Sequence, residues 1–537
     1  MPNSRTPQTA PMPGTNQARN AAGGYSFAVD AWTRLHRFLI LGSEGGSYYA
    51  TELMLTVENA NNLIQCIQMD GPRTVREIVT ISESGRAPKN DPAIFALALA
   101  AGYGDEATRR LALDALPQVC RTGTHLFQFI EFVQRVRGWG RSLRRGVGGW
   151  YNALAARDLA YQLVKYRQRD GWTHTDTLRL AHPKPADATR DTIYQWVTKR
   201  DTDPRPDAIA WATALEAPSD EAQAFIWAFE RAQTATDVET ILQLITEYRL
   251  PREALPTQWL NEVAVWDALL QGMPLTAMIR NLGVMAKVGL LTPLSTAEQT
   301  VIDRLTDKER LRKARIHPIA LLSALRVYRS GRGVRGKGTW LPTPRVIDAL
   351  DEAFYLAFDT VTPTTTRTML ALDVSGSMGW GDIAGVPGLT PREASTALAL
   401  VTARVEPHYS IMAFANQLMP VAISPKMRLD AAMDATRRLP FGGTDCALPM
   451  IYAQTENIPV DTFIILTDSE TWFGNIHPAE ALREYRDQTG IPARLIVVAM
   501  ISNMHSIADP DDPGMLDVVG FDTATPQVMS DFALGNL

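Results

Sequence analysis

The strongest constraint on the fold is a change of pattern near residue 361. Beyond it, apolar runs of strand length alternate with segments of helical periodicity. The apolar runs cover 368–372, 409–414, 462–466 and 493–500, and helices are expected at 391–404, 429–438 and 478–489. Strands that are apolar throughout and separated by helices are typical of a parallel sheet covered on both faces. We therefore predict a doubly wound, Rossmann-like α/β domain over residues 361–537, with ligands bound at the carboxyl ends of its strands.

The chain before residue 361 has helical periodicity almost throughout. The segment 93–100 is apolar on nearly every side, which predicts a buried helix. Short connections favour antiparallel helix pairs, and no fixed sequence period is visible. We predict an irregular α-solenoid over residues 25–360. Residues 1–24 are rich in Pro, Asn, Thr and Gly and have no apolar segment, so they predict a disordered tail.

Composition excludes several classes of protein. The 537 residues exceed what a single core of about 250–300 residues can organise, so at least two domains are expected. No apolar run reaches about 18 residues, so no membrane span is expected. Cys66, Cys120 and Cys446 are widely spaced and follow no paired motif. That usage favours reduced thiols in a cytoplasm over a disulfide framework or a zinc site.

The net charge of −5 conceals a strong asymmetry. Residues 121–200 contain 15 Lys and Arg against 6 Asp and Glu, and residues 301–345 contain 12 against 3. From residue 346 onward the balance reverses, with 10 basic against 24 acidic side chains. Basic stretches of this kind favour polyanion binding, although a solvated helix surface is the alternative. The chain is a basic module joined to an acidic one.

Hydroxyl and carboxylate donors gather at three predicted strand ends. Asp373, Ser375 and Ser377 follow the first strand at every second position, Thr444 lies in a Gly-Gly-Thr loop, and Asp468 ends a later strand. Hard cations such as Mg²⁺ prefer oxygen donors of this kind. We therefore expect these five side chains to bind Mg²⁺ or another divalent cation. Two alternatives stay open: a turn-capping role for Asp373, and a weakly held ion that only orders the loop.

Catalysis is not indicated. A phosphotransferase with an aspartyl nucleophile would want a second carboxylate two residues beyond Asp373, where Ser375 stands. No Ser–His–Asp, Cys–His or His-Glu-x-x-His arrangement is evident. We predict that the chain is not an enzyme.

The densest chemistry of the helical part lies in residues 165–185. Lys165 and Arg169 are four positions apart, so we expect them on one face of a helix that Gly171 ends. Cations interleaved with aromatic residues fit recognition of RNA. His182 could supply a base-edge donor or be a satisfied histidine, and both readings stay open. The candidate RNA contacts in this segment are Lys165, Arg167, Arg169, His182 and Lys184.

A second basic stretch, residues 329–338, alternates cations with glycine. It could mould to an RNA backbone or be a solvated linker, and both stay open. Its candidate contacts are Arg329, Arg332, Arg335 and Lys337.

Several motifs together resemble one family. Asp-x-Ser-x-Ser, then Thr, then Asp, resembles the metal-ion-dependent adhesion site of von Willebrand factor A domains. Residues 165–185 resemble the signature of the TROVE module of the Ro autoantigen family. The motifs Pro318-Ile-Ala-Leu-Leu, Tyr328-x-x-Gly-x-Gly-x-x-Gly336 and Trp340-x-Pro342 also resemble Ro proteins. The resemblance covers the chain after residue 25, and bacterial members would be the nearest relatives.

The resemblance implies more than the residues do alone. Ro proteins close HEAT-type helical repeats into a ring with a basic hole, and their A domain contacts both ends of the arc. Small structured Y RNAs bind the outer surface, and single-stranded 3′ ends of misfolded or immature RNAs enter the hole. Lys165, Arg169 and His182 are the contacts carried over most directly. In the metal site the serines and the threonine usually touch the ion, and one position is open for a partner's carboxylate.

We therefore predict a non-catalytic, monomeric RNA-binding protein of the cytoplasm that acts in RNA quality control and processing. The resemblance implies exoribonucleases such as polynucleotide phosphorylase as partners, with a Y RNA as tether. Two other classes stay open. A protein-interaction scaffold that uses the metal site would show no salt-dependent association with RNA. A metal-dependent ribonuclease would shorten labelled RNA when Mg²⁺ or Mn²⁺ is added.

Overall fold

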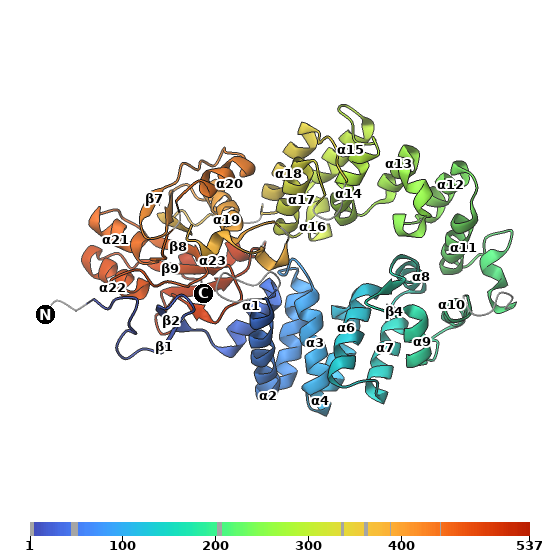
Figure 1. Cartoon of the computed structure of the whole chain (residues 1–537), viewed down its shortest axis with the longest axis horizontal. Coiled ribbons are helices and arrows are strands. Elements are labelled where there is room, and N and C mark those ends of the chain that lie inside the picture. Colours follow the sequence, from blue (N-terminus) through green and yellow to red (C-terminus); the bar gives the residue numbers. More distant parts are fainter. Residues whose placement is uncertain are drawn as a thin grey trace.

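The helices follow one another in an arc, and the α/β domain lies between the two ends of that arc (Figure 1). This computed structural model describes residues 5–43, 52–200, 207–333, 338–358, 363–386, 388–440, 442–522 and 524–536. The predicted α-solenoid, closed into a ring and followed by an α/β domain, is confirmed.

Helices α1 to α18 form the arc, with short 3-10 helices among them. Their bounds are α1 (Ala31–Leu41), α2 (Glu52–Ser84), α3 (Asp91–Tyr103), α4 (Glu106–Asp114), α5 (Leu116–Val119), α6 (Gly123–Val136), α7 (Arg141–Ala153), α8 (Ala156–Lys165), α9 (His174–Ala181), α10 (Ala188–Lys199), η1 (Asp207–Thr213), α11 (Glu221–Thr234), α12 (Val238–Tyr248), η2 (Arg252–Ala254), η3 (Thr257–Asn261), α13 (Val263–Gly272), α14 (Leu275–Lys287), α15 (Thr296–Leu305), α16 (Lys308–Ala314), α17 (Pro318–Ser330) and α18 (Pro344–Leu356).

The α3 helix shows how composition determines position in the arc. Its residues from Ala93 to Ala101 are buried, except for the half-buried Phe95. The helix packs between α2 and α6, so apolar residues on all its sides meet a neighbour. The predicted buried helix is confirmed.

The α/β domain is built on a six-stranded sheet of order β11-β9-β8-β5-β6-β7, parallel except for β7. Its strands are β5 (Thr368–Asp373), β6 (Tyr409–Phe414), β7 (Leu418–Pro420), β8 (Thr462–Thr467), β9 (Arg494–Ala499) and β11 (Met515–Val519). Its helices are η4 (Ser377–Gly379), η5 (Ile383–Gly385), α19 (Pro391–Val405), α20 (Leu429–Arg437), α21 (Leu448–Thr455), α22 (Pro478–Thr489) and α23 (Thr525–Leu534).

Both faces of the sheet are covered, as the apolar strands predict. In β5, Leu370 and Leu372 pack into the core that includes α19 and continues into the arc. The alternate residues Met369 and Ala371 pack into a second core, which includes α21 and α22. A strand buried on both faces must be apolar at every position, and this explains its continuous apolar sequence.

The prediction of a disordered tail over residues 1–24 is wrong for residues 5–24, which we call the N-terminal strap. Residues Gln17–Arg19 form β1, which pairs with β2 (Tyr25–Ala28), and β2 pairs with β10 (His505–Ser506) of the α/β domain. Gln8 and Asn20 are buried against the same domain. Polar residues can be buried when hydrogen bonds satisfy them, and composition alone does not reveal such partners.

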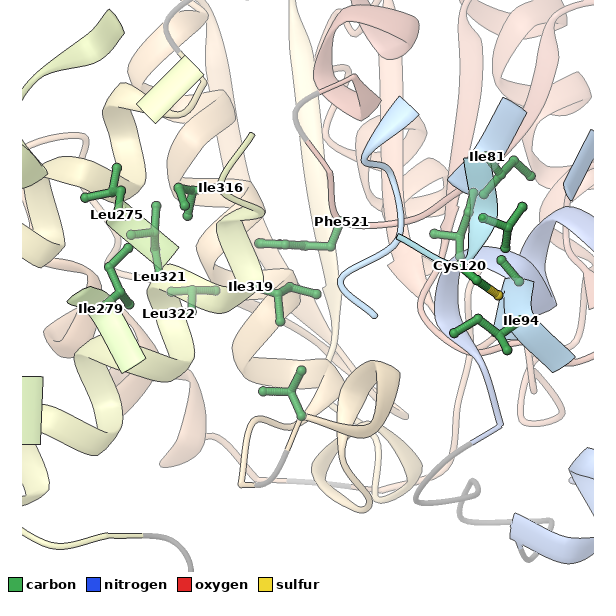
Figure 2. Packing of buried hydrophobic residues seen from close by; sticks show 14 of the residues in the cluster. Ile81, Ile94, Cys120, Leu275, Ile279, Ile316, Ile319, Leu321, Leu322 and Phe521 are labelled. Carbon is green, nitrogen blue, oxygen red and sulfur yellow. The ribbon is translucent and has the colours of Figure 1, made fainter. Parts of the chain in front are cut away.

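The two ends of the arc meet at the α/β domain, at a junction that we call the clasp. From the first end, Arg37 of α1 is fully buried and pairs with Asp517 of β11 at 2.6 Å. From the second end, Phe354 of α18 stacks on Phe521 with ring centroids 6.3 Å apart. In Figure 2, Phe521 has α17 with Ile319 on one side and the apolar side chains of α2 and α3 on the other. The clasp closes the ring through apolar packing and buried charge.

The three cysteines are all inside the protein. Cys66, Cys120 and Cys446 are buried and unpaired. Burial raises the pKa of the Cys66 thiol to about 11, so this thiol is held in its unreactive protonated form.

Among the described residues, no helix is long and apolar enough to cross a membrane.

Candidate functional site

The basic segment 165–185 is not one helix, and the prediction that Lys165 and Arg169 share a helix face is wrong. Helix α8 ends at Lys165, and a hairpin follows that consists of β3 (Gln168–Arg169) and β4 (Trp172–Thr173). Its two-residue loop has positive φ at Asp170 (52°) and at Gly171 (82°). Asp-Gly is the favoured pair for such a tight hairpin turn. This dipeptide was the sequence signal that could have revealed the hairpin.

The break separates the candidate contacts into two environments. Lys165 is half-buried and donates a hydrogen bond from Nζ to the Tyr161 hydroxyl at 2.9 Å. Arg167 and Arg169 are exposed, and Arg169 Nε lies 3.3 Å from a carboxylate oxygen of the neighbouring Asp170. An exposed ion pair of this kind contributes about 0–1 kcal/mol, so it leaves the guanidinium available to a phosphate.

The second half of the segment is organised by Thr173. Its hydroxyl accepts a hydrogen bond from Asp176 N, and the Asp176 carboxylate accepts one from Thr173 N, which together form a capping box for α9. Thr173 is therefore the N-cap of α9. His182 ends α9 in the left-handed region, with φ of 46°, and both it and Lys184 are exposed. His182 is thus an exposed side chain at the end of α9, and both of its readings stay predictions.

The interior histidine of this segment is His174. It is buried, and its Nδ1 lies 2.7 Å from the Tyr151 hydroxyl. Burial lowers its pKa to about 3, so the imidazole is neutral near pH 7. His174 holds α9 against α7 and is a packing residue rather than a ligand.

Lys165 lies in the wall of a large cavity in the middle of the ring, where α8 faces the later helices of the arc (Figure 1). The cavity has a volume of 1370 Å³. Its basic lining residues are Arg157, Lys165, Arg249, Arg252, Arg304 and Arg310, and its acidic ones are Asp158, Glu221, Glu247 and Glu253. Sequence reasoning missed these residues, Lys165 excepted, because they come from helices far apart in the chain.

Aromatic rings accompany the cations of the cavity wall. The Arg157 guanidinium lies 3.7 Å from the centroid of the Phe225 ring, and Lys165 Nζ lies 5.0 Å from that of Tyr161. Both rings line the cavity. Cations together with aromatic faces are what phosphates and unstacked bases require of a binding surface.

The second basic stretch is only partly described. Arg329 pairs with Asp430 of the α/β domain at 3.0 Å, and Arg332 is exposed. Arg335 and Lys337 lie outside the described residues. Arg329 is therefore engaged at the clasp, next to the ion pair between Arg326 and Glu393.

The five candidate metal ligands are all buried, on three segments at the carboxyl edge of the sheet. Asp373 is the last residue of β5, and its carboxylate accepts hydrogen bonds from Ser375 N at 2.9 Å and from the Thr467 hydroxyl at 2.6 Å. The hydroxyls of Ser375 and Ser377 lie 3.1 Å apart. Asp468 directly follows β8. Asp373, Ser375 and Ser377 are thus close together at the end of β5.

The loop of Thr444 is joined to the same edge. Thr444 O accepts hydrogen bonds from Trp472 N and Phe473 N at 3.0 and 3.1 Å. Cys446 Sγ lies 3.7 Å from the Thr467 hydroxyl, which in turn contacts Asp373. These contacts connect the segment around Thr444 to the strand ends of β5 and β8.

The electrostatics of this edge favour a cation. Burial raises the pKa of Asp373, and burial together with the charges of Asp373 and Glu470 raises the pKa of Asp468 well above its usual value. Within the described part of the chain, neither aspartate makes an ion pair, and Arg392 donates instead to Val374 O and Ser375 O at 2.7 and 3.0 Å. Buried carboxylates without a cationic partner, beside two hydroxyls, fit a hard divalent ion. The described residues hold no group of three or more His, Cys, Asp or Glu side chains placed for a metal.

The arc itself closes over this edge of the sheet. A cavity of 20 Å³ is lined by Ser377 and Asp468 on one side and by Leu41, Gly42 and Ser43 from the end of α1 on the other. Such a space admits about one water molecule. The Ser502 hydroxyl donates to Gly42 O at 2.5 Å and fixes the two sides together.

Comparisons with known proteins agree with this architecture. The TROVE domain family matches residues 18–326, and the Ro60 vWA domain family matches residues 367–533. RNA-binding protein RO60 of Deinococcus radiodurans is 45% identical over 526 residues, which cover 97% of this chain and 96% of that protein. RNA-binding protein RO60 of Caenorhabditis elegans is 37% identical over 598 residues, which cover 99% of this chain and 92% of that protein. The crystal structure of the Deinococcus radiodurans RO (RSR) protein superimposes with a TM-score of 0.71, covering 95% of this chain and 100% of that one.

Proposed function

The chain belongs to the Ro60 family, in which a TROVE domain is followed by a Ro60 vWA domain, and we propose that it is a non-catalytic RNA-binding protein. It binds small structured Y-type RNAs on the outer surface of the ring and single-stranded 3′ ends of misfolded or immature RNAs in the central cavity. Its role is RNA quality control and processing, together with an exoribonuclease such as polynucleotide phosphorylase.

The central cavity carries the proposal. Its volume of 1370 Å³ exceeds the roughly 300–1,000 Å³ typical of small-molecule pockets, which favours a polymer end over a metabolite. Cations on the wall attract phosphates, and the acidic side chains among them limit how tightly any one phosphate is held. Tyr161 and Phe225 offer faces on which bases can stack. A duplex stacks its own bases, so the cavity favours a single strand.

Four exposed basic side chains support the proposed binding of a structured RNA. Arg167, Arg169, His182 and Lys184 are all exposed, and they follow one another within 18 residues on a hairpin and a helix end. Lys and Arg neutralise phosphates irrespective of sequence, so RNA shape must supply the selectivity. If about four phosphates are neutralised, raising the salt concentration from 50 to 200 mM should weaken binding roughly a hundredfold.

Separate variants test the two surfaces. Arg169→Ala with His182→Ala should weaken binding of a blunt structured RNA more than tenfold, because both side chains are exposed and belong to the proposed RNA-binding surface. Lys165→Ala should instead reduce the gain in affinity that a single-stranded 3′ tail gives, because Lys165 lines the cavity. The control is Lys426→Ala, which removes an exposed charge from the α/β domain. Gel-shift titrations in which the first two variants match this control would contradict the proposal.

We also propose that the metal site holds Mg²⁺ or another divalent cation. Ser375, Ser377 and Thr444 would hold it directly, with Asp373 and Asp468 completing the site. The ion supplies positive charge to a buried acidic edge and so stabilises the loops that meet there. We place the protein in the cytoplasm, in keeping with three buried thiols that form no disulfide. We further propose that it is a monomer.

A further inference from the structure

The N-terminal strap has more polar contacts with the α/β domain than a connecting segment requires. Gln8 is fully buried, and all of its polar atoms are used. Its Nε2 donates to Asp445 Oδ1 at 2.7 Å and to Ile476 O at 2.8 Å, and its Oε1 accepts a hydrogen bond from the Thr471 hydroxyl. Its backbone N donates to Gly474 O at 2.9 Å. A buried polar side chain with every donor and acceptor satisfied fixes the position of the groups around it.

These contacts fall on the two loops that carry the later metal donors. Asp445 directly follows Thr444, and Thr471 lies three residues beyond Asp468. The Thr471 hydroxyl also accepts a hydrogen bond from Cys446 N at 3.2 Å, so Gln8 and Thr471 together bind both loops. Gln8 therefore ties the Thr444 loop to the Asp468 loop without touching any of the five candidate ligands.

The rest of the strap holds the Asp468 loop in the same way. Asn20 Nδ2 donates to Thr471 O at 2.7 Å, and Ala22 N donates to a carboxylate oxygen of Glu470 at 3.1 Å. Gly24 lies flush against this loop, because a Cβ there would be 2.0 Å from Thr471 O. Close backbone approach of this kind requires glycine.

From this arrangement we propose that the N-terminal strap positions the metal site, with Gln8 as the positioning residue that sets the distance between the Thr444 and Asp468 loops. The inference rests on the proposed metal site and goes beyond it, because it assigns ion affinity to a segment that lies more than 400 residues from Thr444 and Asp468 in the sequence. Partners that orient metal ligands affect ion affinity strongly, and their loss typically weakens binding about 10- to 100-fold.

The test is ion binding by the full chain, measured by titration with Mn²⁺ and detection of free Mn²⁺ by electron paramagnetic resonance. Gln8→Met keeps the bulk of the side chain and removes its hydrogen bonds, and it should weaken Mn²⁺ binding at least about tenfold. The matched control is Arg5→Ala, on the same strap, where the removed ion pair with the distant Glu484 should leave Mn²⁺ affinity unchanged. Melting in EDTA shows whether each variant is folded.

The possible outcomes distinguish an error in the positioning role of the strap from an error in the proposed metal site. If wild type binds Mn²⁺ and Gln8→Met binds it equally well, the positioning role is wrong, even if the variant melts at a lower temperature in EDTA. If wild type does not bind Mn²⁺, the metal site itself is wrong and the inference falls with it. If Gln8→Met does not fold, Asn20→Ala replaces it. That variant removes the contact with Thr471 O and, within the strap, the hydrogen bond that Asn20 Oδ1 accepts from Gly24 N. It should weaken Mn²⁺ binding in the same direction, and an unchanged affinity would overturn the proposal.

Discussion

Arg37 at the clasp gives the sharpest stability prediction. Its guanidinium donates to both carboxylate oxygens of Asp517, at 2.7 and 2.6 Å, and to three acceptors on Asn503 and His505, at 2.7 to 3.1 Å. Arg37 is fully buried, and the Asp517 side chain is only 14% exposed, so water replaces the missing partner only in part. Removing one member of such a pair leaves a buried charge, which typically costs about 3–5 kcal/mol. We expect Arg37→Met to lower the free energy of unfolding at the clasp by this amount.

A double-mutant cycle identifies the origin of the cost. Asp517→Leu combined with Arg37→Met removes both charges, so the double variant should recover a large part of the loss. The assay is urea unfolding of the full chain, followed by fluorescence and by far-UV circular dichroism, because a two-domain chain need not unfold in one step. Additive effects of the two substitutions would refute the reasoning, because the loss would then arise from packing and not from an unpaired charge.

Two further predictions concern pH and the ion. The pKa of His174 is about 3 in the folded state and about 6.5 when unfolded, so the unfolded state binds more protons between these values. The contribution of His174 to the free energy of unfolding should therefore be complete above pH 6.5 and should decrease as the pH falls toward 3. Urea midpoints of His174→Phe should decline less than those of wild type between pH 7 and pH 5, and parallel declines would contradict this. Asp373→Ala should abolish the rise in melting temperature caused by Mg²⁺, expected to correspond to about 2.7 kcal/mol at an ion concentration of 100 Kd, without weakening RNA binding. Loss of RNA binding by the folded variant would instead make the metal site part of the RNA surface.

The α/β domain was predictable because its signals are local. A strand buried on both faces is apolar at every position, and Asp373 had to fall where β5 ends. The ring was anticipated from the family resemblance, since no single residue in the helical part encodes closure. Arg37 and Asp517 form an ion pair across 480 positions of the sequence, and the residues next to each of them carry no signal that predicts it.

The errors have equally specific causes. The four-residue spacing of Lys165 and Arg169 predicts a shared helix face, whereas the Asp170-Gly171 turn signal predicts the hairpin that the structure has. Residues 5–24 were assigned to a disordered tail because their composition is polar, although Gln8 and its neighbours find buried partners on a distant loop. The hairpin follows from a local turn signal, whereas the conformation of residues 5–24 depends on tertiary contacts.

The most direct test of RNA binding is a titration of wild-type protein into a labelled structured RNA with a single-stranded 3′ tail, with and without Mg²⁺, at 50 and 200 mM salt. We predict a shifted complex whose affinity falls roughly a hundredfold at the higher salt, with the RNA intact at full length. The account is contradicted if no salt-dependent complex forms, or if the RNA is shortened when Mg²⁺ is added.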